Sequence, residues 1–356
     1  MNYTLRILIA TLLCGFFPLS YGMENVFYTL RSKDQLQNTL NHIRQHPQAI
    51  QIIVTQAFQV NEKGTVAGFV YHEMVDAAKS KSVKLMAMIT NAGFDQARIH
   101  QFLSSAEAQN KALDFILSAC RENHLYGVQF DFEMVSVKDK DALTHFFKLA
   151  SEKLHKAGFS VSFAVVPALS DDPGPSAFLK KTYQNWSGAY DLKALGKISD
   201  FITIMSYNQH PEGTTPGPVA SVPWVEKTIV HALKYVPARK ISLGVPAYSL
   251  YWYTGTNPAA HSTRITTRRL EISYKHARDI VQQSQTHLKW DAREKMNYSV
   301  YERNWLNEYV YVEDAASFKA KLQLAKKYHL RGISVFRIGT EDERIWALLN
   351  KKSAHG

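Results

Sequence analysis

The chain has 356 residues, 46% of them apolar and 12% aromatic, and this composition excludes a largely disordered protein. Lysine and arginine exceed aspartate and glutamate by 42 to 31, a formal net charge of +11, but no run of five or more basic residues predicts a nucleic-acid partner. The positive charge is compatible with attraction to an anionic polymer or surface, and equally with solubility alone.

The first 22 residues have the features of a secretory signal peptide. Arg6 precedes an apolar run over residues 7–19, and the small residues Ser20 and Gly22 suit a cleavage site. A membrane-spanning helix is the alternative, but it needs roughly 20 apolar residues, and this run is shorter. We therefore predict a secreted, periplasmic or cell-envelope protein that is not stably inserted in a membrane after the signal is removed.

The chain contains two cysteines. Cys14 lies in the predicted signal peptide, where it could carry a lipid, although the bulky Leu13 before it is unfavourable for such attachment. Removal of the signal leaves Cys120 without a partner, so no internal disulfide can stabilise the fold. We expect stability to come from the core of one large domain, residues 23–350, and we expect that domain to be a monomer.

Short apolar runs rich in β-branched residues recur along the chain and predict eight strands. They begin near residues 26, 50, 83, 126, 159, 200, 241 and 332. Most are separated by amphipathic stretches such as residues 140–158, where apolar residues recur three and four positions apart. This alternation favours an α/β fold, a closed (β/α)8 TIM barrel. A doubly wound open sheet is the alternative, but no G-x-G-x-x-G motif follows the first strand.

The longest interval between predicted strands separates the seventh from the eighth. It runs from Tyr248 to about Arg331, and "NEYVYVED" (307–314) within it predicts an additional strand. We interpret residues of about 250–315 as an α+β subdomain inserted between strands 7 and 8. No internal repeat or low-complexity linker predicts a second independent domain.

The segment "YGVQFDFE" (126–133) carries acids within an otherwise apolar strand. Alternate side chains of a strand share a face, so Gln129, Asp131 and Glu133 are expected to line the barrel interior while their apolar neighbours face the helices. Charged groups are rarely buried without a partner, and this pattern therefore indicates a functional site. The alternative interpretation is that Asp131 and Glu133 belong to buried ion pairs or cap a helix.

Two carboxyl groups on one face of a strand compete for a proton, and burial also favours the neutral acid. One member of the pair can thus stay protonated near neutral pH and donate its proton. Glu133 lies at the carboxyl end of the strand, where barrel active sites lie, and is the expected general acid with Asp131 as its partner.

The same segment resembles the D-G-x-D-x-D-x-E signature on strand four of glycoside hydrolase family 18, the chitinase family. The match holds at Gly127, Asp131 and Glu133, whereas Tyr126 and Gln129 stand where the family has aspartate. Replacement of a carboxylate by Gln129 removes one negative charge beneath Asp131, which should ease the ionisation of Asp131.

Three further segments resemble the family in the expected order. Residues 190–210 are similar to the strand-six segment that ends in M-x-Y-D, with Met205 and Tyr207 matched and Asn208 in place of aspartate. "LGVPAYSLYW" (243–252) is similar to the strand-seven element.

The fourth segment, residues 332–346, resembles the last strand, with Phe336 where the family has a tryptophan beneath the sugar. "GPVASVPWVEK" (217–227) and "FRIGTED" are most similar to the branch with spore cortex-lytic N-acetylglucosaminidases and chitinase-domain-containing proteins.

The resemblance implies hydrolysis of β-1,4 bonds next to N-acetylglucosamine by substrate assistance. It implies that Glu133 protonates the leaving oxygen and later activates water, while the acetamide of the substrate attacks the anomeric carbon. Asp131 is then expected to orient the acetamide N–H, and Tyr207 to hydrogen-bond the acetamide oxygen. The net result is retention of configuration.

The expected substrate-binding residues lie at the barrel mouth. They are Gln129, Met205, Asn208, Tyr248, Trp252 and Phe336. Aromatic faces can stack on sugar rings, but packing of the inserted subdomain is an equal alternative for Tyr248 and Trp252.

No cofactor or metal is expected. His42 and His46 have helical i, i+4 spacing, but without a third ligand an exposed helix face is the better interpretation. The expected partner is a polysaccharide that contains N-acetylglucosamine: chitin, chitooligosaccharides, peptidoglycan or an N-linked glycan. A lectin-like protein of the same fold that binds these sugars without cleaving them is the alternative function.

Overall fold

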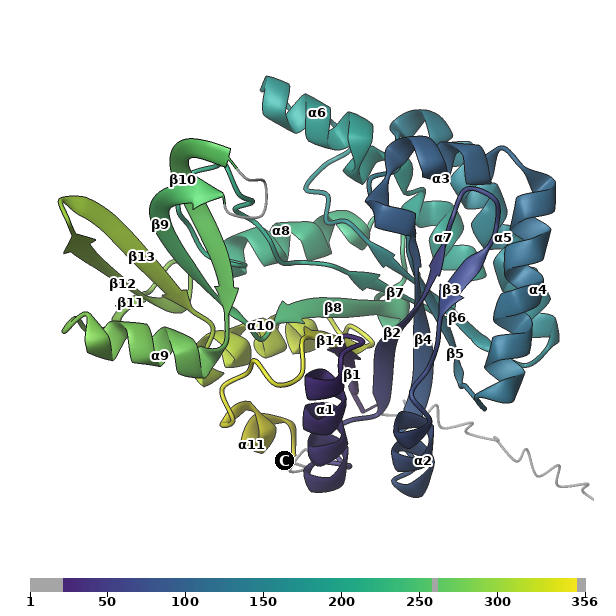
Figure 1. The fold of residues 1–356 in the computed structure, drawn as a ribbon, viewed down its shortest axis with the longest axis horizontal. Coiled ribbons are helices and arrows are strands. Elements are labelled where there is room, and N and C mark those ends of the chain that lie inside the picture. The colour runs from purple at the N-terminus through teal and green to yellow at the C-terminus, as the bar shows by residue number, and fades with distance from the viewer. Residues whose placement is uncertain (1–21, 258–261, 351–356) are drawn as a thin grey trace, which may run out of the picture.

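The computed structural model describes residues 22–257 and 262–350, so residues 1–21 of the predicted signal peptide (1–22) lie outside the described part of the chain. Eight parallel strands form a closed barrel, because the first strand pairs with both the second and the last (Figure 1). The barrel strands are β1 (Glu24–Thr29), β2 (Ile52–Val60), β4 (Lys84–Asn91), β5 (Gly127–Asp131), β6 (Ser160–Val165), β7 (Phe201–Ile204), β8 (Ile241–Pro246) and β14 (Gly332–Phe336). The predicted (β/α)8 barrel and its eight strands are confirmed.

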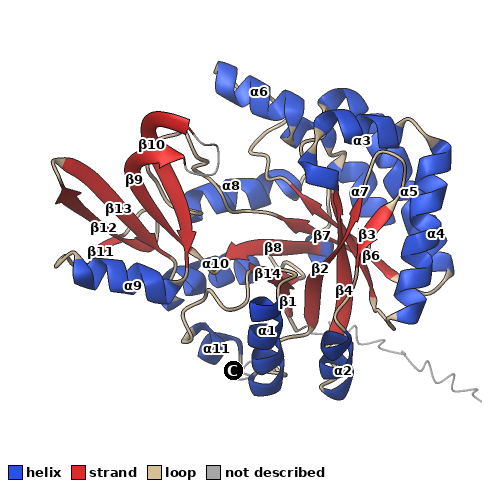
Figure 2. Cartoon of the chain, in the orientation of Figure 1, coloured by secondary structure: helices blue, strands red, loops and turns tan. Residues whose placement is uncertain are grey.

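Helices surround the barrel strands, and one of them, α6 (Ala177–Asn185), buries none of its residues and projects beyond the rest (Figure 2). They are α1 (Lys33–Gln45), α2 (His72–Ser80), α3 (Gln96–Leu103), α4 (Ala106–Glu122), α5 (Lys140–Lys156), α6 (Ala177–Asn185), α7 (Leu192–Ile198), α8 (Val222–Ala232), α10 (Ala315–Lys327) and α11 (Ile345–Leu349). Four 3-10 turns, η1 (Ala92–Phe94), η2 (Val137–Asp139), η3 (Ser187–Ala189) and η4 (Ala238–Lys240), and the short strand β3 (Val66–Gly68) complete the barrel connections.

The apolar residues in β5 and directly after it explain how the barrel and its helices pack. Phe130 and Phe132 point outwards and contact Phe146 and Phe147 of α5, with ring centroids 5.6–5.7 Å apart. The polar residues of the same strand point inwards, as the period of two requires. The outer layer therefore buries the apolar face of α5 and leaves the barrel interior to carry the polar side chains of β5.

An antiparallel sheet is inserted between β8 and β14 and lies beside the barrel (Figure 1). It consists of β9 (Ser249–Asn257), β10 (Ser262–Ile272), β11 (Lys289–Asp291), β12 (Met296–Arg303) and β13 (Leu306–Val312), with α9 (Tyr274–Gln283) against it. β13 is the strand that "NEYVYVED" predicted. None of the helices in the described part of the chain is long and apolar enough to cross a membrane.

Candidate active site

The two acids of β5 lie at the carboxyl end of the barrel strands. Asp131 is the last residue of β5, and Glu133 follows two residues later. The backbone of Glu133 is held by Asn91 at the end of β4: its N–H donates to Asn91 Oδ1 at 2.9 Å, and its carbonyl accepts from Asn91 Nδ2 at 3.0 Å. The Tyr190 hydroxyl donates to the carbonyl of Phe132 at 2.7 Å. The turn that presents Glu133 is therefore fixed from both sides.

Asp131 is a buried acid with an unused hydrogen-bond acceptor. Its side chain is 7% exposed, and its Oδ1 is buried without a hydrogen-bond partner. Burial raises the pKa of Asp131 well above its ordinary value, and the charge of Glu133 raises it further. An unpaired buried oxygen is costly, and such atoms are expected where a ligand supplies the missing partner.

Glu133 is half-buried, and one of its carboxylate oxygens is held by a tryptophan. The indole Nε1 of Trp186 donates to Glu133 Oε2 at 3.0 Å. Burial raises the pKa of Glu133 above its ordinary value, although the hydrogen bond from Trp186 lowers it in part. A carboxylic acid that keeps its proton towards neutral pH is suited to general acid catalysis.

Gln129 lies one layer below Asp131 in a closed polar network. Its Oε1 accepts from the Tyr28 hydroxyl at 2.6 Å, and its Nε2 donates to Ser162 at 3.0 Å and to Thr203 at 3.2 Å. The side chain is 0% exposed, so in this structure it supports the floor of the site and does not contact a ligand. The expectation that Gln129 binds substrate directly is therefore corrected.

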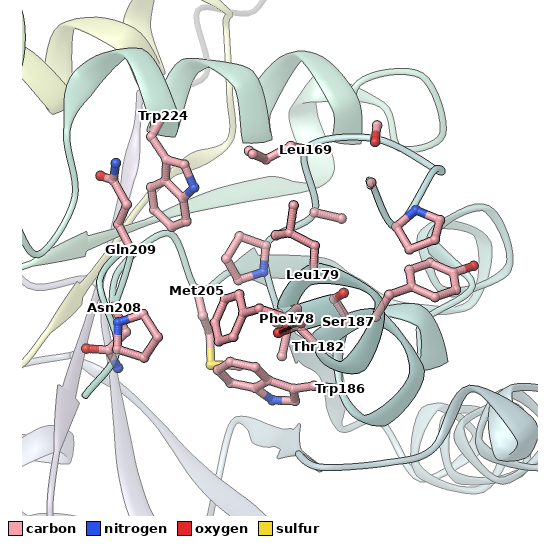
Figure 3. A pocket seen from close by; sticks show the side chains of 18 of the residues that line it. Leu169, Phe178, Leu179, Thr182, Trp186, Ser187, Met205, Asn208, Gln209 and Trp224 are labelled. Carbon is pink, nitrogen blue, oxygen red and sulfur yellow. Dashed lines mark hydrogen bonds between the residues drawn. The ribbon is translucent and has the colours of Figure 1, made fainter. Parts of the chain in front are cut away.

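A cleft of about 310 Å³ has Glu133 among its lining residues, and Figure 3 shows this cleft from close by. Its walls come from the loop after β6 and helix α6, and from the loop after β7 and the start of α8. The labelled side chains that project into it include Leu169, Phe178, Leu179, Trp186, Met205 and Trp224. The lining of the cleft is mainly apolar and includes the acid Glu133, and small-molecule sites commonly combine an apolar lining with a few polar groups.

Tyr207, Met205, Asn208 and Phe336 are brought together near the acids. Met205, Tyr207 and Asn208 line the cleft with Glu133. The ring of Tyr207 stacks on Phe336 at 5.3 Å, which fixes its orientation. Burial, followed by the charges of neighbouring groups, raises the pKa of Tyr207 well above its ordinary value, so its hydroxyl remains a donor.

Two predicted sugar-stacking residues are packed inside the protein. Trp252 is 0% exposed, and its Nε1 donates to the carbonyl of Gly217 at 2.9 Å. Tyr248 is 1% exposed, and its hydroxyl donates to Asn208 Oδ1 at 2.7 Å. Both side chains join the inserted sheet to the barrel and leave no face for a sugar, so these two expectations are corrected in favour of packing.

Sequence reasoning missed Trp186 and Arg269. Arg269 Nη1 donates to Asn208 Oδ1 at 2.9 Å, so a residue of the inserted sheet fixes a cleft side chain. Both residues come from loops or insertions outside the four family-like segments. Their sequence neighbourhoods carry no periodic signal, and the fold alone brings them to the site.

No group of three or more histidine, cysteine, aspartate or glutamate residues that could hold a metal is present among the described residues. The rings of His42 and His46 lie against Trp346, with centroids 5.3 and 4.3 Å from its ring. His42 is buried, and its Nε2 lies 2.9 Å from Glu341 Oε1. The expectation of an exposed helix face is therefore wrong for His42, whose imidazole has a structural partner.

Comparison with known proteins matches the chain to a family model. The family model "Glycosyl hydrolases family 18" matches residues 24–341, which includes every barrel strand and the inserted sheet. Among curated proteins, the chain is 27% identical over 333 residues to a cortical fragment-lytic enzyme of Bacillus subtilis, a match that covers 92% of this chain and 73% of the relative.

Solved structures show the same fold. The spore cortex-lytic enzyme SleL of Bacillus megaterium matches with a TM-score of 0.79 and 23% identity, over 92% of this chain and 73% of that one. A chitinase from Chromobacterium violaceum also matches with a TM-score of 0.79, at 21% identity, over 94% of this chain and 100% of that one.

Proposed function

Since the chain belongs to the glycosyl hydrolases of family 18 and is thus a glycoside hydrolase, we propose that it is an exported, retaining enzyme that cleaves β-1,4 bonds at N-acetylglucosamine residues. The observation that carries this proposal is a pair of neighbouring carboxyl groups, the half-buried Glu133 that lines the cleft and the buried Asp131 behind it. Asp131 and Glu133 both have raised pKa values, and Asp131 keeps a buried oxygen without a partner.

The first step of the proposed reaction is proton transfer from Glu133 to the glycosidic oxygen. As the bond from the anomeric carbon to that oxygen breaks, the acetamide oxygen of the same sugar bonds to the anomeric carbon from the opposite face. The unpaired Oδ1 of Asp131 is suited to accept the acetamide N–H, which completes its hydrogen bonding. The Tyr207 hydroxyl is suited to donate to the acetamide oxygen.

The second step returns the proton to Glu133. The Glu133 carboxylate takes a proton from water, and the water oxygen bonds to the anomeric carbon while the acetamide oxygen leaves. Two inversions at one carbon give net retention. A raised pKa suits both steps, because the acid keeps its proton in the free enzyme and the carboxylate is a stronger base afterwards.

The proposed substrates are chitin, chitooligosaccharides or peptidoglycan. Support comes from the relatives, one named a cortical fragment-lytic enzyme and another a chitinase. Residues 1–22 have the pattern of a signal peptide, which supports release from the cytoplasm into the envelope or the medium.

The test is hydrolysis of aryl glycosides of chitobiose and chitotriose, beside purified peptidoglycan, by the mature protein and its Glu133→Gln variant. We expect product release that falls at least about 100-fold in the variant, because a positioned acid contributes that much or more. Binding of N-acetylglucosamine oligomers without cleavage by the wild-type protein would instead indicate a lectin.

A further inference from the structure

We propose that Trp186 is a positioning residue for the acid: its indole N–H holds one oxygen of the Glu133 carboxyl group and directs the other oxygen to the sugar. This inference rests on the proposed function, because it concerns how the general acid of that reaction is oriented. The observation that supports it is the 3.0 Å hydrogen bond from Trp186 Nε1 to Glu133 Oε2.

The chemistry of the indole decides which oxygen carries the proton. An indole N–H is a donor only and cannot accept a hydrogen bond. When Glu133 is protonated, its carbonyl oxygen is a better acceptor for the Trp186 N–H than its hydroxyl oxygen is, so the proton is favoured on Oε1. The proton is thus kept on the oxygen that is left to face the glycosidic bond.

The hydrogen bond is supported by a well-anchored segment. Trp186 lies between α6 and η3, and its backbone N–H donates to the carbonyl of Thr182. Four residues later, the Tyr190 hydroxyl donates to the carbonyl of Phe132, next to Glu133 in the chain. On the other side, Gln96 of α3 donates to Asn185 Oδ1 at 3.4 Å. The indole is therefore fixed on both sides relative to the turn that carries the acid.

The other titratable groups that face Glu133 do not favour its carboxylate form through their charge. The titratable groups around it are Asp131 of β5, Tyr190 after η3, and Tyr207 after β7. A charge on any of these three is negative and favours the neutral acid. Trp186 is the group that favours the carboxylate, and so it limits how far the pKa of Glu133 rises.

The direct test is a carbon-13 NMR titration of the Glu133 carboxyl carbon in the wild-type protein and in Trp186→Phe. The Glu133→Gln variant identifies the resonance. Phenylalanine keeps an aromatic ring but removes the donor, so the titration midpoint of Glu133 is expected to rise by about one pH unit. A midpoint equal to that of the wild-type protein overturns the inference.

Trp224→Phe is the matched control. Trp224 also lines the cleft, but it projects from α8. The Trp224→Phe substitution is therefore expected to leave the titration midpoint of Glu133 unchanged. If Trp186→Phe does not fold, replacement of the indole by benzothiophene keeps the bicyclic shape and removes only the N–H. An equal shift in both tryptophan variants would also overturn the inference, because a general change of cleft polarity would then explain it.

Kinetics gives a second readout that separates this inference from the proposed function. For an acid that must be protonated, kcat/KM falls as pH rises through the pKa of that acid. Because Trp186→Phe is expected to raise the pKa of Glu133, the alkaline limb of the kcat/KM profile is expected to move to higher pH. The plateau is expected to fall about tenfold, because a misplaced acid is less effective. An inactive wild-type protein would refute the proposed function, whereas an active Trp186→Phe variant with an unmoved limb would refute only the role of Trp186.

Discussion

At the scale of single residues, the site contains a carboxyl group whose burial is unfavourable for its charged form. Asp131 is buried beside Glu133 with an oxygen that no protein group satisfies. Burial and the charge of Glu133 raise the pKa of Asp131, so the folded protein binds its proton more tightly than the unfolded chain does. Asp131 therefore contributes most to stability at low pH, and that contribution is lost as pH rises through the pKa of the folded state.

Asp131→Asn is accordingly expected to stabilise the protein at pH 7 by about 1 kcal/mol or more, because it removes a buried charge that has no counter-charge beside it. The difference is expected to vanish near pH 3, where both states hold the proton. Urea unfolding of both proteins at the two pH values measures this. Activity is expected to fall in the same variant.

Asp200→Asn is the control with the opposite sign. Burial would raise the pKa of Asp200, but hydrogen bonds from the Val161 N–H, His155 and Ser160 hold it below its ordinary value. This variant is expected to lose stability at pH 7. An Asp131→Asn variant that is less stable than the wild-type protein at pH 7 would contradict this account of the site.

The sequence predicted the acids but not their surroundings. Asp131 and Glu133 could be identified because a strand has a period of two and their neighbours are apolar. Trp186 could not be identified, because its contact with Glu133 joins residues 53 positions apart through an irregular loop. For Trp252 the sequence left sugar stacking and packing as equal alternatives, because exposure of an aromatic side chain after a strand depends on what packs over it.

At the scale of elements, helix α6 is unusual because it buries none of its residues. Phe178 and Leu179 remain 54% and 43% exposed, and both line the same cleft as Glu133. A helix with exposed apolar residues beside a site contributes little to folding and is available to contact a ligand. We interpret α6 as a wall of the substrate cleft.

Replacement of both Phe178 and Leu179 by serine tests this interpretation. KM for an N-acetylglucosamine oligomer is expected to rise about tenfold, since the lost contacts amount to about 1.4 kcal/mol. The free energy of unfolding is expected to change by about 0.5 kcal/mol or less, as for other surface positions. Phe69→Ser, at an apolar residue that is 52% exposed and does not line the cleft, is the control and is expected to leave KM unchanged. An unaltered KM in the double variant would remove α6 from the binding site.

At the scale of the whole molecule, the inserted sheet is joined to the barrel by a buried ion pair. Lys321 of α10 is 0% exposed, and its Nζ donates to both oxygens of Glu313, which follows β13, at 3.0 and 2.9 Å. Burial raises the pKa of Glu313 even though Lys321 opposes the shift. The attraction between the two charges offsets the cost of burying them only while both residues are present.

Lys321→Met is expected to destabilise the protein by about 3 kcal/mol, because Glu313 is left buried without its counter-charge. The double variant Lys321→Met with Glu313→Leu is expected to regain most of that loss, since two apolar residues need no partner. Unfolding of the single and double variants in urea gives the coupling energy. Simple addition of the two single effects would contradict the importance of the pair.

The global fold was more predictable than the site. Eight strand-like runs separated by helical periods specify a closed barrel, and "NEYVYVED" identified a strand of the insertion. The way the insertion meets the barrel was not predictable, because contacts such as Arg269 with Asn208 join residues 61 positions apart. Periodicity describes which face of an element is apolar, but not which distant polar groups meet.

The central claim is that Glu133 and the acetamide of the substrate together cleave the glycosidic bond. The most direct measurement is proton NMR of the first product formed from an N-acetylglucosamine oligomer, before its anomers equilibrate. The account predicts that the new reducing end appears as the β anomer, and that Glu133→Gln produces no such signal. Initial appearance of the α anomer would mean a single inverting displacement by water and would contradict substrate assistance.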